Sequence, residues 1–394
     1  MPALAAVLPL VQRPYADAAA VAASLQPDEP VFCFSPAQLA ARARVFLNGF
    51  PGEVSFAVKS NPAACVLSTL AKAGLSVFDV ASVREMEAVR AAVGEAEFHY
   101  HNPVKSRGEI AAAHARFGCR RFAADSPEEI AKIADIVGGD ASVEVAVRFV
   151  LPPERGASAH DFSTKFGAHE HAAIALLADV AKRGYRPVLT FHPGSQAREP
   201  QAYVRHIEAA ARIAKGAGVA LAALNVGGGF PANYATSTAP EPDVFFRVID
   251  KAVRRCFGPA RPKLECEPGR GLVATSMSLL TRVKLVCSDA DDLFINDGVY
   301  GGLMECWQAP ALMPPHRLIR DGAVLEGESR AFKVFGPTCD PLDALPDRLD
   351  LPQDVREGDY IEFGTLGAYG IATSTRFNGY GDHAIVEVEE ALVL

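Results

Sequence analysis

The sequence predicts an α/β protein, with a closed barrel of eight parallel strands followed by a domain of antiparallel strands. Within residues 54–267, eight short runs rich in β-branched and aromatic residues alternate with Ala-rich segments of helical period. After residue 272 the helical segments stop, and stretches that alternate apolar and polar residues follow one another. Strand–helix alternation is typical of a parallel sheet. A count of eight favours a (β/α)8 TIM-like barrel over the alternative, an open doubly wound sheet.

The strand candidates of the barrel are short apolar runs that end in polar residues. They are VSFAVK (54–59), VFDV (77–80), FHYHN (98–102), RFAAD (121–125), VEVAVRF (143–149), VLTFH (188–192), LAALNV (221–226) and KLECE (263–267). The helices between them have recognisable caps. In DSPEEIAKIADIVGG, Ser126 is the expected N-cap, Pro127 the first helical residue and Glu129 the partner that completes a capping box.

The domain boundaries follow from the change of pattern near residue 272. We assign residues 27–272 to the barrel, and residues 1–26 together with 273–394 to the β domain. The strand-like run VFCF (31–34) precedes the first barrel strand and could pair with the β domain, which would make that domain discontinuous.

Composition limits the classes of function. The chain has 394 residues, 49% hydrophobic and 22% charged, which excludes a disordered, collagenous or coiled-coil protein. The net charge of −8, without a basic run, argues against nucleic acid and anionic membranes as partners. The eight cysteines form no C-x-x-C pair, and His169 and His171 read as a solvated loop, so we expect no metal site. Without a signal peptide or a long apolar run, we expect a cytoplasmic protein.

Polar and glycine residues at the carboxyl ends of the strands form the candidate site, because these ends meet at one mouth of a barrel. They are Lys59, Asp79, Asn102, Asp125, Arg148, His192, the glycine run 227–229, Glu267 and Arg270. A lysine amine in a low-dielectric mouth loses its proton readily, so Lys59 is a candidate imine-forming nucleophile. VGGGF (226–230) with EPGR (267–270) matches the phosphate site that barrels build after strands 7 and 8. A phosphate and a lysine together predict pyridoxal phosphate.

A series of motifs runs along nearly the whole chain. In order they are FAVKSNP, FDVAS, HNPVKS, FAADS, KFGA (165–168), FHPGSQ (191–196), NVGGGFP (225–231), ECEPGRGLVA (265–274), NDGVYGGL (296–303), GPTCDPLDAL (336–345) and GAYGIATSTRFNGYG (367–381). The series resembles the fold type III pyridoxal-phosphate amino-acid decarboxylases, the ornithine, lysine and diaminopimelate decarboxylases, and is closest to ornithine decarboxylase. The resemblance implies an alanine racemase-like fold and pyridoxal 5'-phosphate as cofactor.

The resemblance also implies roles for single residues. Lys59 would hold the cofactor as a Schiff base and later reprotonate the product or assist its release. Glu267 would face the pyridine nitrogen and keep it protonated, which suits decarboxylation; the related alanine racemases have an arginine there. His192 would stack on the ring. The remaining cofactor-binding residues would be Asp79 and Arg148 in the pocket, and Ser195, Gly228, Gly229, Arg270 and Tyr369 at the phosphate.

The substrate side is implied by residues after the barrel. In the family the cysteine of GPTCD, here Cys339, reaches the site of the partner subunit and protonates Cα. Asp340 would meet the distal amine of the substrate, with Tyr300 nearby. The resemblance therefore implies a homodimer with shared active sites that converts ornithine, or secondly lysine, to putrescine or cadaverine and CO2, as in polyamine biosynthesis.

Two alternatives stay open. Eukaryotic-type ornithine decarboxylases have a second aspartate for the distal ammonium, and an ungapped count from Tyr300 reaches Ala309 at that position, with Glu305 as a polar neighbour. The first alternative is therefore a decarboxylase of a different amino acid with an altered distal pocket, including meso-diaminopimelate. A catalytically inactive homologue that acts as a binding protein is disfavoured, because the cofactor set is complete.

Overall fold

The computed structural model describes residues 14–152, 165–287 and 289–394, and its chain divides into two compact units. The barrel unit consists of residues 42–231 and 239–272. The β unit consists of residues 1–41, 232–238 and 273–394, of which residues 1–13 lie outside the described part.

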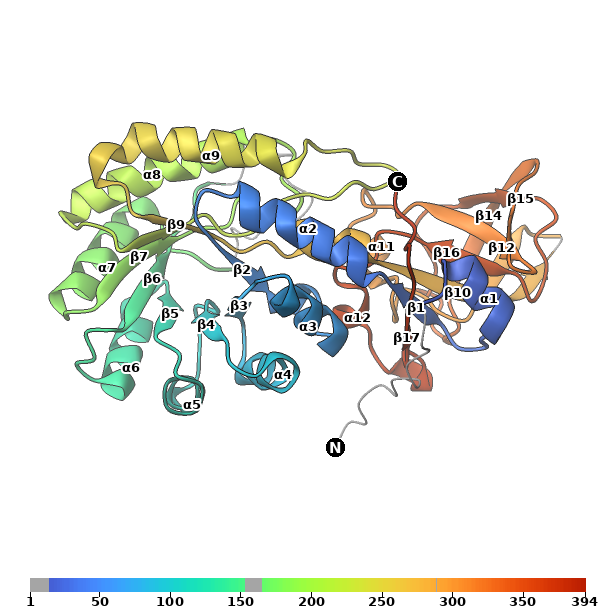
Figure 1. The fold of residues 1–394 in the computed structure, drawn as a ribbon, viewed down its shortest axis with the longest axis horizontal. Coiled ribbons are helices and arrows are strands. Elements are labelled where there is room, and N and C mark those ends of the chain that lie inside the picture. Colours follow the sequence, from blue (N-terminus) through green and yellow to red (C-terminus); the bar gives the residue numbers. More distant parts are fainter. Residues whose placement is uncertain (1–13, 153–164, 288) are drawn as a thin grey trace. The chain divides into compact units, whose positions relative to one another are not determined.

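The barrel unit is a closed barrel of parallel strands in chain order, with β9 paired to β2, as predicted. Helices α3 to α9 lie around its outside (Figure 1). The strands are β2 (Glu53–Ala57), β3 (Val77–Val80), β4 (Glu97–Tyr100), β5 (Arg121–Ala124), β6 (Glu144–Arg148), β7 (Arg186–Thr190), β8 (Ala223–Asn225) and β9 (Lys263–Cys266). The helices of this unit are η1 (Val58–Ser60), α3 (Ala64–Lys72), α4 (Val83–Val93), α5 (Arg107–Phe117), α6 (Pro127–Val137), α7 (Glu170–Lys182), α8 (Gln201–Ala217), α9 (Pro242–Phe257) and η2 (Gly258–Ala260), and the two helices that cross a unit boundary in the chain are α2 (Pro36–Gly49) and α10 (Arg270–Val273).

The barrel strands direct alternate residues inward and outward. Large side chains face the helices and are at most 2% exposed, namely Phe56, Phe78, Phe98 and Phe122. Small residues fill part of the interior, where Ala123, Ala146, Val188 and Ala223 form one buried cluster. The rest of the interior is polar, with buried histidine, arginine and glutamate side chains. Period-two alternation therefore decides which polar residues of a strand can reach the mouth.

The predicted cap of α6 is confirmed in part. The Ser126 side chain accepts a hydrogen bond from the Glu129 backbone N–H at 3.3 Å, and Pro127 is the first helical residue. The capping box is wrong, because the Glu129 carboxylate pairs instead with the Lys105 ammonium at 3.0 Å. Lys105 is 2% exposed, and a buried ammonium requires a counter-charge more than a helix end requires a second cap.

The β unit contains one mixed sheet, in the order β13-β12-β16-β10-β11-β14-β15, with β1 between β10 and β17. Its elements are α1 (Ala18–Leu25), β1 (Val31–Phe34), η3 (Ala274–Ser276), β10 (Met277–Cys287), β11 (Asp292–Ile295), α11 (Met304–Gln308), β12 (His316–Arg320), β13 (Ala323–Leu325), β14 (Ser329–Phe335), β15 (Leu349–Pro352), β16 (Tyr360–Phe363), α12 (Gly370–Thr373), η4 (Phe377–Gly379) and β17 (Ala384–Glu387). Most pairs are antiparallel as expected, but β1 with β17 and β11 with β14 are parallel.

Strand β1 is part of the β unit, although it precedes the first barrel strand in the chain. Val31 to Phe34 pair with β10 on one side and β17 on the other, so this run belongs to the β unit. Along the chain, the compact units change after residues 41, 231, 238 and 272. The pairing of β1 with the β domain was raised from the sequence, but four apolar residues do not identify which strands of that domain are the partners.

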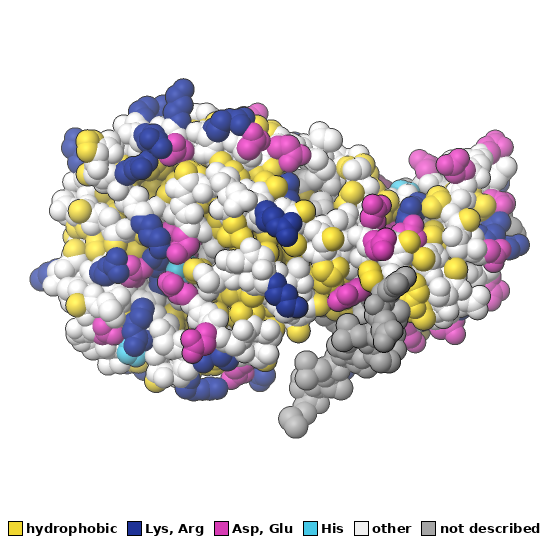
Figure 2. Space-filling view, viewed as in Figure 1, with side chains coloured by type: hydrophobic (Ala, Val, Ile, Leu, Met, Phe, Trp, Pro, Cys, Tyr) yellow, Lys and Arg dark blue, Asp and Glu magenta, His cyan; other side chains and the backbone are white. Residues whose placement is uncertain are grey.

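Two surface properties bear on partners. Among the described residues, the helices are too short or too polar to cross a membrane. On the face drawn in Figure 2, basic and acidic side chains are interspersed over the barrel unit, without a broad area of basic side chains alone.

Candidate active site

Lys59 lies two residues beyond the end of strand β2, and not at the end of the strand as expected. The strand ends at Ala57, and Lys59 is the middle residue of the short 3-10 helix η1. Its neighbours Val58 and Ser60 are buried, and Ser60 Oγ donates to the Ala57 carbonyl oxygen at 2.8 Å, which fixes the turn. The Lys59 side chain is exposed, and its charge acts on the acidic pair formed by Asp79 and Glu267.

Glu267 is the central acid of the barrel mouth. It follows β9 and is 7% exposed. Its Oε1 accepts hydrogen bonds from His101 Nδ1 and from Asn225 Nδ2, the latter at 2.6 Å. Burial alone would raise the pKa of Glu267, but the charge and hydrogen bond of His101, with the Lys59 charge, lower it to about 2. Glu267 is therefore an anion at neutral pH.

Asp79 lies beside the same histidine, with its Oδ1 3.5 Å from His101 Nδ1. Burial and the Glu267 carboxylate raise the pKa of Asp79 to about 7, although Lys59 and His101 oppose that rise. The site thus contains one carboxylate that stays charged and a second that holds its proton more firmly. Two carboxylates with such different proton affinities are typical of a functional site.

His192 lies two residues beyond β7 and is half-buried. The Gly194 backbone N–H donates to His192 Nδ1 at 3.1 Å, so in the neutral ring the proton is on Nε2. Burial and the charges of Lys59 and Arg148 lower the pKa of His192 to about 3. A ring that stays neutral can stack on an aromatic cofactor without adding charge to its face.

Arg148 and Asp125 lie on neighbouring strand ends of the same mouth. The Arg148 guanidinium carbon lies 5.6 Å from the centre of the Phe166 ring, in the KFGA motif. Asp125 Oδ2 accepts a hydrogen bond from the Gly167 backbone N–H at 2.9 Å, which holds that motif in place. Burial lowers the pKa of Arg148, and the carboxylates of Glu267, Asp125 and Asp79 oppose the shift.

The glycine run forms a close-packed turn over the ends of β7 and β9. Gly227 has a φ of +70°, and a Cβ there would lie 2.1 Å from the Phe191 carbonyl oxygen. A Cβ on Gly228 would lie 2.7 Å from the Glu267 carbonyl oxygen and 3.2 Å from His192 Nε2. Only glycine permits this close approach of the backbone segments, as in the glycine turns that bind phosphate in other proteins.

Ser195 and Arg270 complete the phosphate side of the barrel mouth. They are 6% and 3% exposed, and the Arg270 Nε donates to Ser195 Oγ at 3.4 Å. A buried guanidinium and hydroxyl beside a glycine turn fit a phosphate dianion, because a guanidinium is positively charged and both groups donate hydrogen bonds to phosphate oxygens. The donor set of the mouth therefore suits a phosphorylated pyridine with an acid at its nitrogen.

The substrate residues predicted after the barrel lie in the β unit. The Tyr300 hydroxyl donates to Asp340 Oδ2 at 2.6 Å, and this hydrogen bond lowers the pKa of Asp340. Cys339 is exposed, and its backbone N–H donates to Asn378 Oδ1 at 3.1 Å. Tyr369 has a φ of 62° at the residue before α12. The roles predicted for these residues stay predictions.

His101 and Asn225 are the two residues of the mouth that sequence reasoning missed. Asn102 was expected at the end of its strand, but β4 ends at Tyr100, and Asn102 Nδ2 caps the Ala81 carbonyl oxygen at 3.4 Å. His101 instead faces the interior. Period-two alternation with the buried His99 is the signal that could have identified it.

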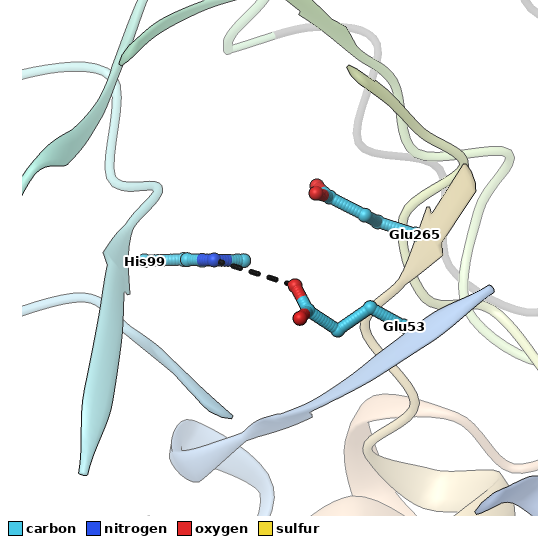
Figure 3. Close-up of side chains that lie close together, drawn as sticks. All are labelled: Glu53, His99 and Glu265. Carbon is cyan, nitrogen blue, oxygen red and sulfur yellow. Dashed lines mark ion pairs between the residues drawn. The ribbon is translucent and has the colours of Figure 1, made fainter. Parts of the chain in front are cut away.

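A second histidine–acid cluster lies two residues earlier on β4 and β9 (Figure 3). His99 and Glu265 are each at most 1% exposed, and His99 Nε2 lies 3.9 Å from Glu53 Oε1. The carboxylates here are already neutralised, since Arg121 forms a two-point ion pair with Glu265 and Lys263 Nζ lies 2.9 Å from Glu53. A divalent cation would have to displace both, so this cluster is a structural ion-pair network.

Known proteins share both the sequence and the fold. The family model described as the pyridoxal-binding domain of pyridoxal-dependent decarboxylases matches residues 37–274. A lysine/ornithine decarboxylase of Selenomonas ruminantium is 32% identical over 335 residues, which are 83% of this chain and 81% of the relative.

Two solved structures show the same likeness. A crystal structure of the decarboxylase SrLDC with pyridoxal phosphate covers 93% of both chains, with 28% identity and a TM-score of 0.82. The lysine/ornithine decarboxylase of Vibrio vulnificus with putrescine covers 93% of this chain and 96% of its own, with 27% identity and a TM-score of 0.80. The protein therefore belongs to the fold type III pyridoxal-phosphate-dependent decarboxylases, and its cofactor is pyridoxal phosphate.

Proposed function

We propose that the protein removes the α-carboxylate of a basic L-amino acid, with ornithine as first and lysine as second substrate, and forms putrescine or cadaverine. The observation that carries the proposal is Glu267, a buried carboxylate that stays charged at the barrel mouth. Bound pyridoxal phosphate supplies the electron sink for the breaking Cα–carboxylate bond, and a protonated pyridine nitrogen makes that sink strongest. An acid that stays anionic beside that nitrogen suits this demand.

The residues of the mouth would each contribute one task. Lys59 is the amine that would hold the cofactor, and its exposed side chain extends from η1, directly after β2. Ser195 and Arg270 would bind the phosphate with the glycine turn. His192, neutral because of its lowered pKa, would pack on the ring. Glu267 would hold the proton at the pyridine nitrogen.

The substrate assignment depends on the acid of the β unit. Asp340 accepts the Tyr300 hydroxyl, which lowers its pKa further below neutral pH, so it offers a negative charge to a distal ammonium. Cys339 is proposed to donate the proton that replaces the carboxylate at Cα. We further propose that both act across a homodimer, and that the diamine product serves polyamine biosynthesis in the cytoplasm.

A different distal group is the second candidate. Ala309, at the place of the expected second aspartate, is 5% exposed and follows α11, while Glu305 within that helix is 6% exposed. One carboxylate fewer would weaken the preference for a distal ammonium. Meso-diaminopimelate or another amino acid would then be the better substrate.

A panel of amino acids tests the proposal. The enzyme saturated with pyridoxal phosphate is incubated with L- and D-ornithine, L- and D-lysine, L-arginine and meso-diaminopimelate, and the CO2 released is measured. We expect the highest kcat/KM for L-ornithine, and Asp340→Asn should raise KM for it by about 10-fold or more, as expected for a charged hydrogen bond. Turnover of meso-diaminopimelate alone would favour the second candidate, and no turnover of any substrate would overturn both.

Subunit mixing tests the shared site. Lys59→Ala and Cys339→Ala are each expected to lose most activity alone. If each site combines Lys59 of one subunit with Cys339 of the other, refolding the two variants together should restore about a quarter of the activity, since half of the dimers are mixed and each has one intact site. A mixture no more active than its parts contradicts the shared site.

A further inference from the structure

We propose that His101 is a positioning residue, which holds Glu267 anionic and aims its carboxylate at the pyridine nitrogen of the cofactor. The inference rests on the family's cofactor and deepens the proposed function, because it names what controls the acid of the site. The contact between the His101 ring and the Glu267 carboxylate is the observation that supports it.

The geometry leaves Glu267 little freedom to turn. His101 is 7% exposed, and its Nδ1 donates to Glu267 Oε1. Asn225 Nδ2 donates to the same oxygen at 2.6 Å. The Asn225 amide cannot flip, because its Oδ1 accepts the Gly227 backbone N–H at 2.8 Å. Both of these side-chain donors therefore bind the same carboxylate oxygen, Oε1.

The charges around the pair explain why a donor is needed there. Glu267 is buried and lies near the Asp79 carboxylate, and both effects favour uptake of a proton by one of the two acids. His101 lies between them, with Nδ1 3.5 Å from Asp79 Oδ1. Its hydrogen bond to Glu267 assigns the negative charge to Glu267. Asp79 is then the acid that takes the proton.

The other groups that face the pair come from neighbouring strands. Lys59 after β2, Arg148 of β6 and His192 after β7 all act electrostatically on Glu267 or Asp79. The first two are cations that act on both carboxylates. They therefore favour ionisation of either acid and do not select Glu267. Only the His101 ring forms a direct contact with the Glu267 carboxylate among these charged or titratable groups.

The test compares variants that keep or remove the donor. His101→Asn places an amide N–H where the imidazole Nδ1 donates. His101→Leu and His101→Ala remove the donor, the first with similar volume and the second with a cavity. His99→Asn is the matched control, since it removes a buried imidazole of the same strand that has no hydrogen bond to Glu267. Thermal unfolding of each apoprotein identifies variants that fold.

The readouts are the Kd of the apoprotein for pyridoxal phosphate, the pH dependence of the visible absorbance of the bound cofactor, and kcat separately from KM. We expect His101→Leu and His101→Ala to raise Kd about 10-fold or more, the cost of a hydrogen bond to a charged group, and to lower kcat more than they change KM. In these two variants, the pH at which the visible absorbance of the bound cofactor changes should differ from that of the wild type. His101→Asn and His99→Asn should stay within about threefold of wild type.

Two results would overturn the inference. One is that His101→Leu or His101→Ala folds and has the same Kd for pyridoxal phosphate and the same absorbance spectrum as the wild type. The other is equal impairment by His101→Asn and His101→Leu, which would assign the effect to the imidazole shape. If the wild type itself binds cofactor but decarboxylates none of the amino acids, the proposed function fails instead, and the Kd and absorbance readouts still decide the role of His101.

Discussion

The barrel contains the same triplet of residue types twice, at two depths. At the mouth, Glu267 and Asp79 flank His101; one layer deeper, Glu265 and Glu53 flank His99 (Figure 3). The difference lies in the cations. The deeper acids are paired with Arg121 and Lys263, whereas Glu267 accepts from His101 and Asn225.

The two layers teach that residue type alone does not decide function. Arg121 forms ion pairs with Glu265 and Glu144, so the deeper charges satisfy one another and hold β5, β6 and β9 together. At the mouth, the hydrogen bonds keep Glu267 charged without a permanent ion pair to a guanidinium. An anion kept charged in this way can bind the cofactor, while a neutralised one only stabilises the fold.

Removal of Lys59 should give the largest effect on the mouth. Lys59→Ala deletes the amine that would hold the cofactor, and loss of such a covalent group costs on the order of 10³-fold or more in kcat. The variant should also lose the absorbance that the cofactor has only when a lysine amine holds it covalently. A spectrophotometric titration with pyridoxal phosphate checks this, with Lys72→Ala on α3 as the control lysine. The absorbance of lysine-bound cofactor in Lys59→Ala would contradict the assignment.

Removal of Arg121 should give the largest effect on the deeper layer. Arg121→Ala leaves Glu265 and Glu144 buried without their guanidinium partner, and the expected loss is about 3–5 kcal/mol in the free energy of unfolding. Urea unfolding of the apoprotein measures it. Arg107→Ala, in an exposed ion pair with Asp135, is the control and should cost no more than about 1 kcal/mol. Equal losses in both variants would refute the structural role.

Asp79 should make the apoprotein less stable as the pH rises. Its pKa in the folded protein is about 7 against an ordinary value of 3.8, so the folded state binds the proton more tightly between these values. The free energy of unfolding therefore falls with rising pH in that window. His192, with a pKa lowered to about 3, has the opposite sign.

Asp79→Asn isolates the first effect. We expect the wild type to lose stability relative to the variant between pH 4 and pH 7, as measured by urea unfolding of both apoproteins at steps across that range. A constant difference between the two proteins across the window would show that Asp79 titrates normally.

His99 should give the smallest effect on activity. Burial and the nearby charges of Arg121 lower the pKa of His99 well below its usual value, so the ring is neutral in the deeper layer. His99→Asn should change kcat/KM by less than about twofold, because His99 does not reach Glu267, whatever it costs in stability. A 10-fold loss of kcat/KM in a folded variant would mean that the two layers are coupled.

The barrel and most of its site could be predicted, because both follow from local patterns. Eight repeats of strand and helix predicted a closed barrel. The polar residues at the strand ends predicted a site with Lys59, Asp79, His192 and Glu267, which the structure places at one mouth. The pairing of VFCF (31–34) with the β domain, raised from the sequence, is confirmed, but its partner strands β10 and β17 lie far along the chain and could not be named from the local pattern.

The errors inside the barrel have a similar cause. The Glu129 carboxylate does not cap its helix because it forms an ion pair with the buried ammonium of Lys105, which comes from another loop. His101 was missed because the predicted strand ended at residue 102, two residues beyond the end of β4. Asn102 was therefore expected to be the side chain that points into the barrel. A sequence pattern does not show which buried charge will find which partner.

One crossed measurement tests the contrast between the two layers most directly. Glu267→Gln and Glu265→Gln are the same substitution two residues apart on and after β9. For both variants, kcat/KM for CO2 release from L-ornithine and the free energy of unfolding are measured. We predict that Glu267→Gln lowers kcat/KM about 10²–10³-fold with little loss of stability, the cost typical of one lost electrostatic group. Glu265→Gln should lose stability and keep kcat/KM within about threefold. Equal effects of the two variants on both quantities would contradict the account.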